Sequence, residues 1–188
     1  MRKVANGGEI GATVSRSALL DRGSDRRFRA LVYNLLTISS RMNVMREHLA
    51  DRMGLSAPQY SVLMAVAQFA GEGGVGVGAV ARLLHVSSAF IASETGKLVQ
   101  AGLLRKRSNP RDRRGVLLSI TRAGRALIQV NRDEICAIND AFFGTLDRSA
   151  FEGLSRVAAT LVKGSQAAMA RVRLAEDDAI AALRTSTD

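Results

Sequence analysis

Apolar residues recur three and four positions apart through residues 25–53, and this spacing predicts a long amphipathic helix. The apolar seam consists of Phe28, Leu31, Leu35, Ile38, Met42, Met45 and Leu49. At about 1.5 Å of rise per residue, a seam of this kind is on the order of 30 Å long. An apolar stripe of that length needs a partner helix, either from elsewhere in the chain or from a second chain.

A second helix is expected after Gly54, which ends the first one. Ser56 and Gln59 have the spacing of a capping box, and apolar residues continue from there to the next glycine. The glycine-rich stretch 71–78 loosely resembles a dinucleotide-binding turn, but no run of βαβ units follows it. A loop with a short strand at residues 75–77, joining a small sheet, is therefore the favoured interpretation.

The stretch from residue 77 to residue 121 has the order of a helix-turn-helix with a wing. Residues 77–84 predict a short helix, residues 85–86 predict a turn, and Ser87 is expected to cap a second helix over 87–101. A strongly basic hairpin follows, with a returning strand over residues 116–120. This combination is typical of proteins that enter the grooves of DNA.

The helix over residues 87–101 is predicted to be the recognition helix. Phe90, Ile91, Leu98 and, at the margin, Thr95 have the spacing of a core-facing side. The opposite side carries small side chains, which let the backbone lie deep in the major groove and let hydroxyl and methyl groups reach base edges. The predicted DNA-facing residues are Ser87, Ser88, Ala89, Ala92, Ser93 and Lys97.

The hairpin that follows places six cations within residues 105–114, against the single acid Asp112. Arginine at a narrow tip suits the negative potential of the minor groove, and the other cations suit phosphates. Asp112 is expected to pair with a neighbouring arginine and brace the loop. The DNA-binding cations predicted here are Arg105, Arg107, Arg111, Arg113 and Arg114.

The rest of the chain predicts two further long helices. One is capped by Thr121 and runs to about residue 146, and the last is capped by Asp147 or Ser149. The expected fold is mainly α, a winged helix-turn-helix with a small β-wing and long N- and C-terminal helices that form a dimerisation region. The expected organisation is a mobile arm at 1–24, dimerisation helices at 25–53 and 122–176, the winged helix-turn-helix at 54–121 and a polar tail at 177–188.

Composition narrows the class of partner. The 188 residues carry a net charge of +10, which favours a polyanion such as double-stranded DNA. Cys136 is the only cysteine and there are two histidines, so no intramolecular disulfide, no metal site and no cofactor are expected. No apolar run approaches the roughly 20 residues that span a bilayer, and the N-terminus lacks a signal-peptide core. We expect a cytoplasmic protein.

These motifs resemble the MarR family of bacterial winged-helix transcriptional regulators over about residues 25–175. The most specific part is the wing, where Asp112-Arg113-Arg114-Gly115 leads into a strand that closes in Thr121-Arg122-Ala123-Gly124. Further matches are Leu55-Ser56, Val80-Ala81, Val86-Ser87 and Leu98 with Ala101-Gly102-Leu103-Leu104. The resemblance implies a homodimer in which Arg113 reaches the minor groove, Asp112 and Arg114 brace the wing, and the major groove is faced by Ser88, Ala89, Ser93 and Lys97.

Members of this family often bind small aromatic acids between the dimerisation helices and the DNA reader. The resemblance therefore implies a pocket near the junction of the first two helices. Polar groups at that junction, which could pair with a carboxylate or stack on a ring, are Arg41, Arg46, His48 and Tyr60. An oxidant-sensing cysteine is not expected, because the first helix contains none.

Two functions of different classes are compatible with these features. The favoured hypothesis is a sequence-specific regulator, a repressor that binds a pseudo-palindromic operator as a homodimer and is released by an aromatic carboxylic acid. The alternative is a winged-helix module whose basic wing docks on an acidic protein. An enzyme is disfavoured, since neither paired carboxylates in a cleft nor a phosphate loop can be recognised.

Overall fold

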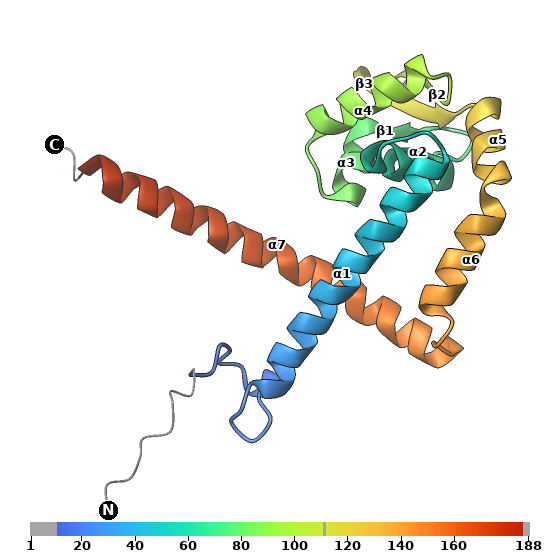
Figure 1. The fold of residues 1–188 in the computed structure, drawn as a ribbon. Helices are drawn as coiled ribbons and strands as arrows, with labels where there is room; N and C mark the ends of the chain where they lie inside the picture. The colour runs from blue at the N-terminus through green and yellow to red at the C-terminus, as the bar shows by residue number, and fades with distance from the viewer. Residues whose placement is uncertain (1–10, 111, 186–188) are drawn as a thin grey trace, which may run out of the picture. The chain divides into compact units, whose positions relative to one another are not determined.

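A computed structural model describes residues 11–110 and 112–185, with side chains placed for residues 11–110 and 115–180. The chain divides into two compact units, one ending at Ile135 and the other beginning at Cys136. The first unit contains a mainly helical body and one three-stranded sheet, as predicted (Figure 1). The second unit consists of the end of one helix and a single long helix.

The stretch before the first helix is attached to the start of that helix. Residues Ser17–Leu19 form a 3-10 helix within the stretch that was predicted to be a mobile arm. Thr13 donates two hydrogen bonds to the carboxylate of Asp25, from its backbone N–H at 2.7 Å and from its hydroxyl at 2.8 Å. Arg29 lies 2.8 Å from the other carboxylate oxygen. Residues 13–25 thus form a closed loop on α1 (Arg26–Arg52) rather than a free arm.

This attachment predicts a pH dependence at the start of α1. The hydrogen bonds from the backbone and hydroxyl of Thr13, with a smaller contribution from Arg29, lower the pKa of Asp25 below 3.8, although burial opposes them. The stabilisation is therefore present above about pH 3.8 and is lost as the pH falls through the lower, folded-state pKa.

NMR observation of the Thr13 amide during acidification should show a transition with its midpoint below pH 3.8. Asp25→Asn should abolish that transition, because the replacement has no carboxyl group to titrate. A midpoint at or above the ordinary carboxyl pKa would contradict the placement of Thr13.

Helix α1 confirms the predicted amphipathic helix. In the structure only its C-terminal end is packed, with Leu49 and Ala50 buried, while Leu31, Leu35, Ile38 and Met42 on the predicted seam are exposed. Over most of its length, the apolar seam is therefore exposed rather than packed.

Helix α2 (Ala57–Phe69) begins with the capping box predicted from the sequence. The Ser56 hydroxyl accepts a hydrogen bond from the backbone N–H of Gln59, and the Gln59 side chain accepts one from the backbone N–H of Ser56. Two backbone donors that no helix carbonyl could reach are satisfied in this way. Four residues of α2 are buried, so this helix lies at the centre of the first unit: Val62, Leu63, Ala65 and Val66.

The predicted helix-turn-helix is confirmed. Helix α3 (Val77–Leu84) ends at His85, which has a left-handed backbone with φ of 55° and closes the turn. Helix α4 (Ser88–Gln100) begins after Ser87, whose hydroxyl accepts from the Phe90 backbone N–H at 3.1 Å. The two helices pack against each other and against α2.

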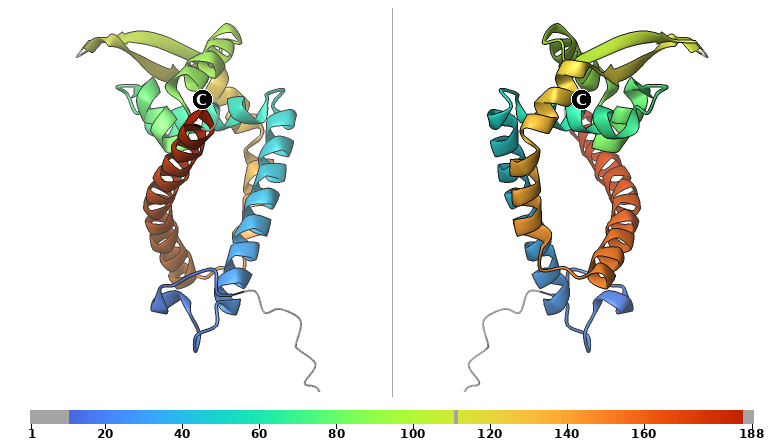
Figure 2. Two further views of the ribbon diagram at one scale, coloured as in Figure 1. Left: turned by 90° about the vertical axis from the view of Figure 1, so that its left-hand side faces the viewer. Right: turned by 90° about the vertical axis from the view of Figure 1, so that its right-hand side faces the viewer.

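The sheet has the strand order β1-β3-β2 and is antiparallel throughout. Strand β1 (Val75–Gly76) pairs with β3 (Asp112–Ile120), as the sequence predicted for residues 75–77. Strand β2 (Leu104–Asn109) forms the other side of the hairpin, which projects beyond the helices of this unit (Figure 2). The strands are longer than predicted, because the cations of residues 105–107 are part of the ladder.

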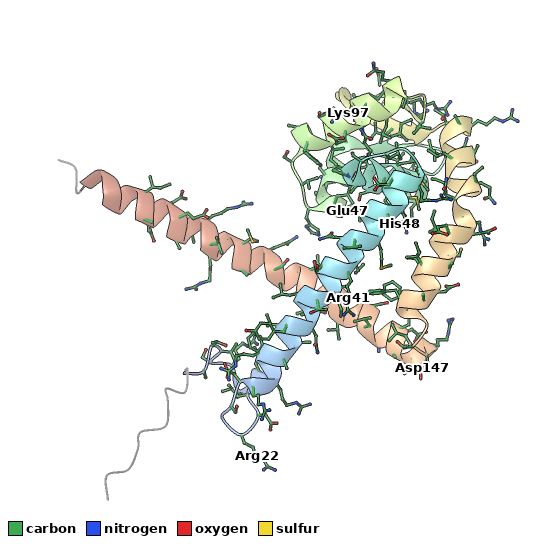
Figure 3. The ribbon with its side chains drawn as sticks, viewed as in Figure 1. Arg22, Arg41, Glu47, His48, Lys97 and Asp147 are labelled. Atoms are coloured by element: carbon green, nitrogen blue, oxygen red, sulfur yellow. The ribbon has the colours of Figure 1, made fainter. Side chains whose placement is uncertain are left out.

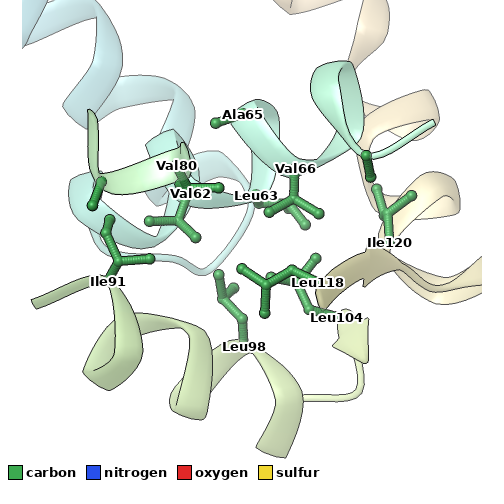
Figure 4. Packing of buried hydrophobic residues seen from close by; sticks show 12 residues of the cluster. Val62, Leu63, Ala65, Val66, Val80, Ile91, Leu98, Leu104, Leu118 and Ile120 are labelled. Atoms are coloured by element: carbon green, nitrogen blue, oxygen red, sulfur yellow. The ribbon is translucent and has the colours of Figure 1, made fainter. Parts of the chain in front are cut away.

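One apolar core joins these elements (Figure 4). Helix α2 contacts α3, α4 and β3, and both long strands contribute a leucine to the same cluster. Burying a residue of this size stabilises a fold by about 1.5–3 kcal/mol. The large residues that are almost completely buried are Leu63, Ile91, Leu98, Leu104, Leu118, Val62, Val66 and Val80.

The prediction of one continuous helix from Thr121 to about residue 146 is wrong. The structure has α5 (Arg122–Val130) and α6 (Arg132–Phe143), separated at Asn131. The Asn131 side chain donates to the carbonyl of Leu127 at 2.9 Å, while its backbone N–H bonds to Ile128 rather than continuing the regular ladder. Such side-chain bonding competes with the helix backbone and ends α5.

The last helix, α7 (Arg148–Thr185), is also longer than predicted. Asp147, one of the two proposed caps, accepts from the Ala150 backbone N–H at 2.7 Å. The expected tail at 177–188 is wrong for residues 177–185, which are helical; residues 186–188 lie outside the described residues. Alanine is the commonest residue in this segment, and its high helix propensity, with that of Leu183 and Arg184, outweighs the two aspartates.

Candidate nucleic-acid interface

The exposed face of α4 is composed of small residues and one cation. Ser88, Ala89, Ala92, Ser93 and Lys97 are all exposed, as required of residues that face DNA. The helix thus presents hydroxyl and methyl groups along a side without bulky chains, which suits close approach to a groove. Ser87 is exposed too, although its hydroxyl already caps the helix.

The core-facing side of α4 differs from the prediction at two positions. Ile91, Thr95 and Leu98 are buried as expected, but Phe90 is 41% exposed. Glu94 is buried, with 6% of its surface exposed, and the sequence interpretation had assigned it no role. Glu94 lies three residues after Ile91 and four before Leu98, a spacing that predicts burial on the core-facing side of α4. Its charge, by contrast, favours an exposed position.

The basic wing is built on paired strands. Arg105, Lys106 and Arg107 are exposed on β2, and Arg105 lies directly opposite Ser119 of β3. The guanidinium of Arg107 donates to the carbonyl of Gly73, so this cation joins the wing to the loop that precedes β1. Arg107 thus has a structural partner in addition to the DNA-binding role predicted for it.

The tip of the hairpin carries the remaining predicted cations. Asn109 of β2 pairs with Asp112 of β3 at the end of the ladder, and Pro110 lies in a turn. Arg111 lies outside the described residues. The backbones of Asp112, Arg113 and Arg114 lie in β3 next to this turn, and their side chains are outside the described residues.

Thr121 connects the wing to the end of the recognition helix. Its hydroxyl oxygen lies 2.7 Å from the carbonyl oxygen of Gly102 and accepts a hydrogen bond from the Gly124 backbone N–H at 3.0 Å. Its backbone N–H bonds to the carbonyl of Leu103. The threonine and glycine of the wing motif therefore fix the start of α5 against the loop that follows α4.

The four predicted ligand-binding residues have different surroundings. His48 Nε2 lies 3.0 Å from the Glu134 carboxylate, whereas Arg41 and Arg46 are exposed on α1 (Figure 3). Arg41 lies two helical turns from His48, roughly 10 Å along the axis. Tyr60 is half-buried, and burial raises the pKa of its hydroxyl. His48 therefore already has the Glu134 carboxylate as a partner within the chain, which makes it less available to the carboxylate of a ligand.

The described part of the chain has neither a cluster of metal-ligating side chains nor a helix that could span a membrane. No group of three or more histidine, cysteine, aspartate or glutamate side chains there could hold a metal ion. No helix among the described residues has the length and apolar character required to cross a membrane.

Comparison with known proteins shows which family the central part of the chain is similar to. Residues 53–115 match the model of the MarR family, and this segment contains α2, α3, α4, β1, β2 and the start of β3. No curated protein sequence matches the chain.

Solved structures of MarR-family regulators have the same fold. CouR from Rhodococcus jostii RHA1, bound to p-coumaroyl-CoA, is 21% identical with a TM-score of 0.63, covering 70% of this chain and 90% of CouR. A MarR-family regulator from Rhodococcus sp. RHA1 is 20% identical with a TM-score of 0.61, covering 73% and 96%. MepR of S. aureus, in complex with DNA, is 14% identical with a TM-score of 0.57, covering 71% and 96%.

Residues 53–115 therefore match the MarR family model, and the fold of this chain is similar to that of solved MarR-family regulators. One protein with this fold, MepR, is bound to DNA in its structure.

Proposed function

We propose that the chain acts as a homodimer that binds a pseudo-palindromic operator and represses transcription until a small ligand releases it. The observation that carries the proposal is the exposed small-residue face of α4, which adjoins a hairpin whose described cations are also exposed. Small residues permit close approach to bases, and the cations supply affinity for phosphates. Such a regulator would work in the cytoplasm, where its DNA is.

The proposal of a dimer rests on apolar surface. The seam of α1 is exposed over most of its length, and α7 exposes Phe151, Leu154, Val157 and Leu161 along its own stripe. Contiguous apolar stripes of this length are rare on monomeric proteins and mark interfaces. A dimer would place two copies of α4 at the fixed separation that a two-fold symmetric operator requires.

The proposal of a ligand rests on chemistry at the junction of α1 and α2. CouR, which shares this fold, is bound to p-coumaroyl-CoA in its structure. In this chain the exposed guanidinium groups of Arg41 and Arg46 could pair with a carboxylate, and the ring of Tyr60 could stack on an aromatic group. We propose an aromatic carboxylic acid as the ligand.

The test is binding of the purified protein to the intergenic DNA upstream of its own gene, with an unrelated duplex as the comparison. We expect selective binding that weakens steeply between about 50 and 200 mM salt, by a slope of about −0.9 for each phosphate neutralised. One member of a panel of aromatic acids should release the protein. Selective binding that no acid disturbs would contradict the proposed ligand. The proposed function as a DNA-binding regulator would still stand.

The alternative is a module whose basic wing docks on an acidic protein, and selectivity separates the two functions. A protein-docking wing would bind all DNA duplexes equally weakly, because phosphate contacts carry no sequence information. Equal affinity for the upstream DNA and the unrelated duplex would therefore favour the docking module.

A further inference from the structure

The recognition helix contains a buried carboxylate. Glu94 is 6% exposed and lies on the side of α4 that carries Ile91 and Leu98. One of its oxygens, Oε1, is 2.7 Å from the ammonium nitrogen of Lys97. The other, Oε2, is inaccessible to solvent and has no hydrogen-bond partner among the described residues.

Burying a carboxylate with one unpaired oxygen is energetically unfavourable. Buried polar groups are nearly always hydrogen-bonded, and an oxygen without a partner loses its hydration without compensation. An apolar side chain at position 94 would extend the stripe formed by Ile91 and Leu98 and would avoid that loss. The retained carboxylate has one described interaction, the charge-assisted bond to Lys97.

Lys97 is the member of this pair that faces outward. Its side chain is 57% exposed, and it is the cation among the predicted DNA-facing positions of α4. A free lysine has a long flexible stem and can reach any nearby phosphate. The bond to Glu94 instead holds the ammonium group against the surface of its own helix, with its positive charge partly neutralised.

We propose that Glu94 is a specificity-determining positioning residue, which tethers Lys97 and so suppresses its contact with phosphates on non-specific DNA. The proposal rests on the DNA-binding function proposed above. The ion pair keeps the ammonium beside the Glu94 carboxylate at the surface of α4, where it is less able to reach the phosphates that a free lysine could contact. Because non-specific affinity comes almost entirely from phosphate contacts, the tether increases discrimination rather than affinity.

The direct test is Glu94→Gln, which keeps the size of the side chain and removes its charge. Released Lys97 should contact one more phosphate, so the salt slope on an unrelated duplex should steepen by about 0.9. Over a fourfold change in salt, that slope corresponds to an extra change of roughly 3.5-fold in non-specific affinity. The ratio of specific to non-specific affinity should fall.

Two controls separate tethering from a general effect of charge. Glu72→Gln makes the same change of charge at an exposed position on the loop before β1, and it should leave the slope within error of wild type. The double variant Glu94→Gln/Lys97→Met should lose the gain seen in Glu94→Gln, since the gain acts through the ammonium group. If Glu94→Gln does not fold, Glu94→Met suits the apolar neighbours and carries the same expectation.

The outcomes are distinguishable. Two results would refute the tether while the proposed function stands, provided that the wild-type protein binds its upstream DNA selectively. One is a salt slope in Glu94→Gln equal to that in Glu72→Gln. The other is a double variant that keeps the steeper slope of Glu94→Gln. If the wild-type protein shows no selectivity for any DNA, the proposed function fails and this inference fails with it. A steeper slope in Glu94→Gln that disappears in the double variant supports the tether.

Discussion

Replacing Gly124 with alanine is expected to destabilise the winged-helix unit by about 3 kcal/mol or more, a large fraction of the stability of a small domain. A Cβ atom at this position would overlap the backbone carbonyl oxygen of Leu103 and would lie 2.8 Å from Cγ1 of Ile120. A backbone carbonyl has little freedom to move away. Chemical denaturation followed by circular dichroism measures the loss.

Gly96→Ala is the matched control in the same unit. The added Cβ would meet nothing within 4 Å, and alanine favours a helix over glycine, so stability should stay equal or rise by up to about 1 kcal/mol. If Gly124→Ala were as stable as wild type, the close approach of α5 to the end of α4 would be refuted.

This junction matters for function as well as stability. Thr121 and Gly124 hold the start of α5 against Gly102 and Leu103, and β2 begins immediately afterwards at Leu104. The orientation of the wing relative to the recognition helix therefore depends on a few hydrogen bonds and one position without a side chain. A substitution here should reduce DNA binding as well as stability.

Arg113→Ala is expected to give the largest loss of DNA affinity of any single wing substitution, about 1–3 kcal/mol or roughly 5- to 150-fold. The backbone of Arg113 lies in β3 directly after the Asn109–Asp112 pair that ends the ladder, and arginine at a narrow tip is attracted by the negative potential of the minor groove. Fluorescence anisotropy with labelled upstream DNA measures the change. Arg107→Ala should have a smaller effect on affinity, since its guanidinium already binds the carbonyl of Gly73.

Arg156→Ala serves as the control for net charge, because Arg156 lies exposed on α7 outside the winged helix. We expect affinity near that of wild type, and light scattering should show the same oligomeric state for all three variants. An equal loss from Arg113→Ala and Arg156→Ala would contradict a wing-specific contact and would leave only a non-specific effect of charge.

Local signals made the winged helix predictable from the sequence. The capping box at Ser56, the cap at Ser87 and the cap at Thr121 each depend on residues within three positions of one another, and the structure confirms all three. The periodicity of Ile91 and Leu98 identified the inner side of α4, and the residues of α4 predicted to face DNA, Ser88, Ala89, Ala92, Ser93 and Lys97, are exposed. Short-range chemistry was sufficient for these features.

Features that depend on tertiary context were not predictable. The burial of Glu94 was not predicted although its helical spacing fits the core-facing side, because carboxylates are rarely buried unless they are paired. The length of β2 depends on its pairing with β3. Phe90 is exposed although it has the helical spacing of the inner side, so periodicity alone does not determine burial.

The most direct test of the central claim is a nuclease footprint of the wild-type protein on its upstream DNA. A homodimer with one α4 on each half-site should protect two regions whose centres are about one helical turn, roughly 10–10.5 base pairs, or a multiple of it apart. Point changes in either half-site should weaken binding to both. Protection of a single half-site, or uniform weak protection along the fragment, would contradict a dimeric reader of a symmetric operator.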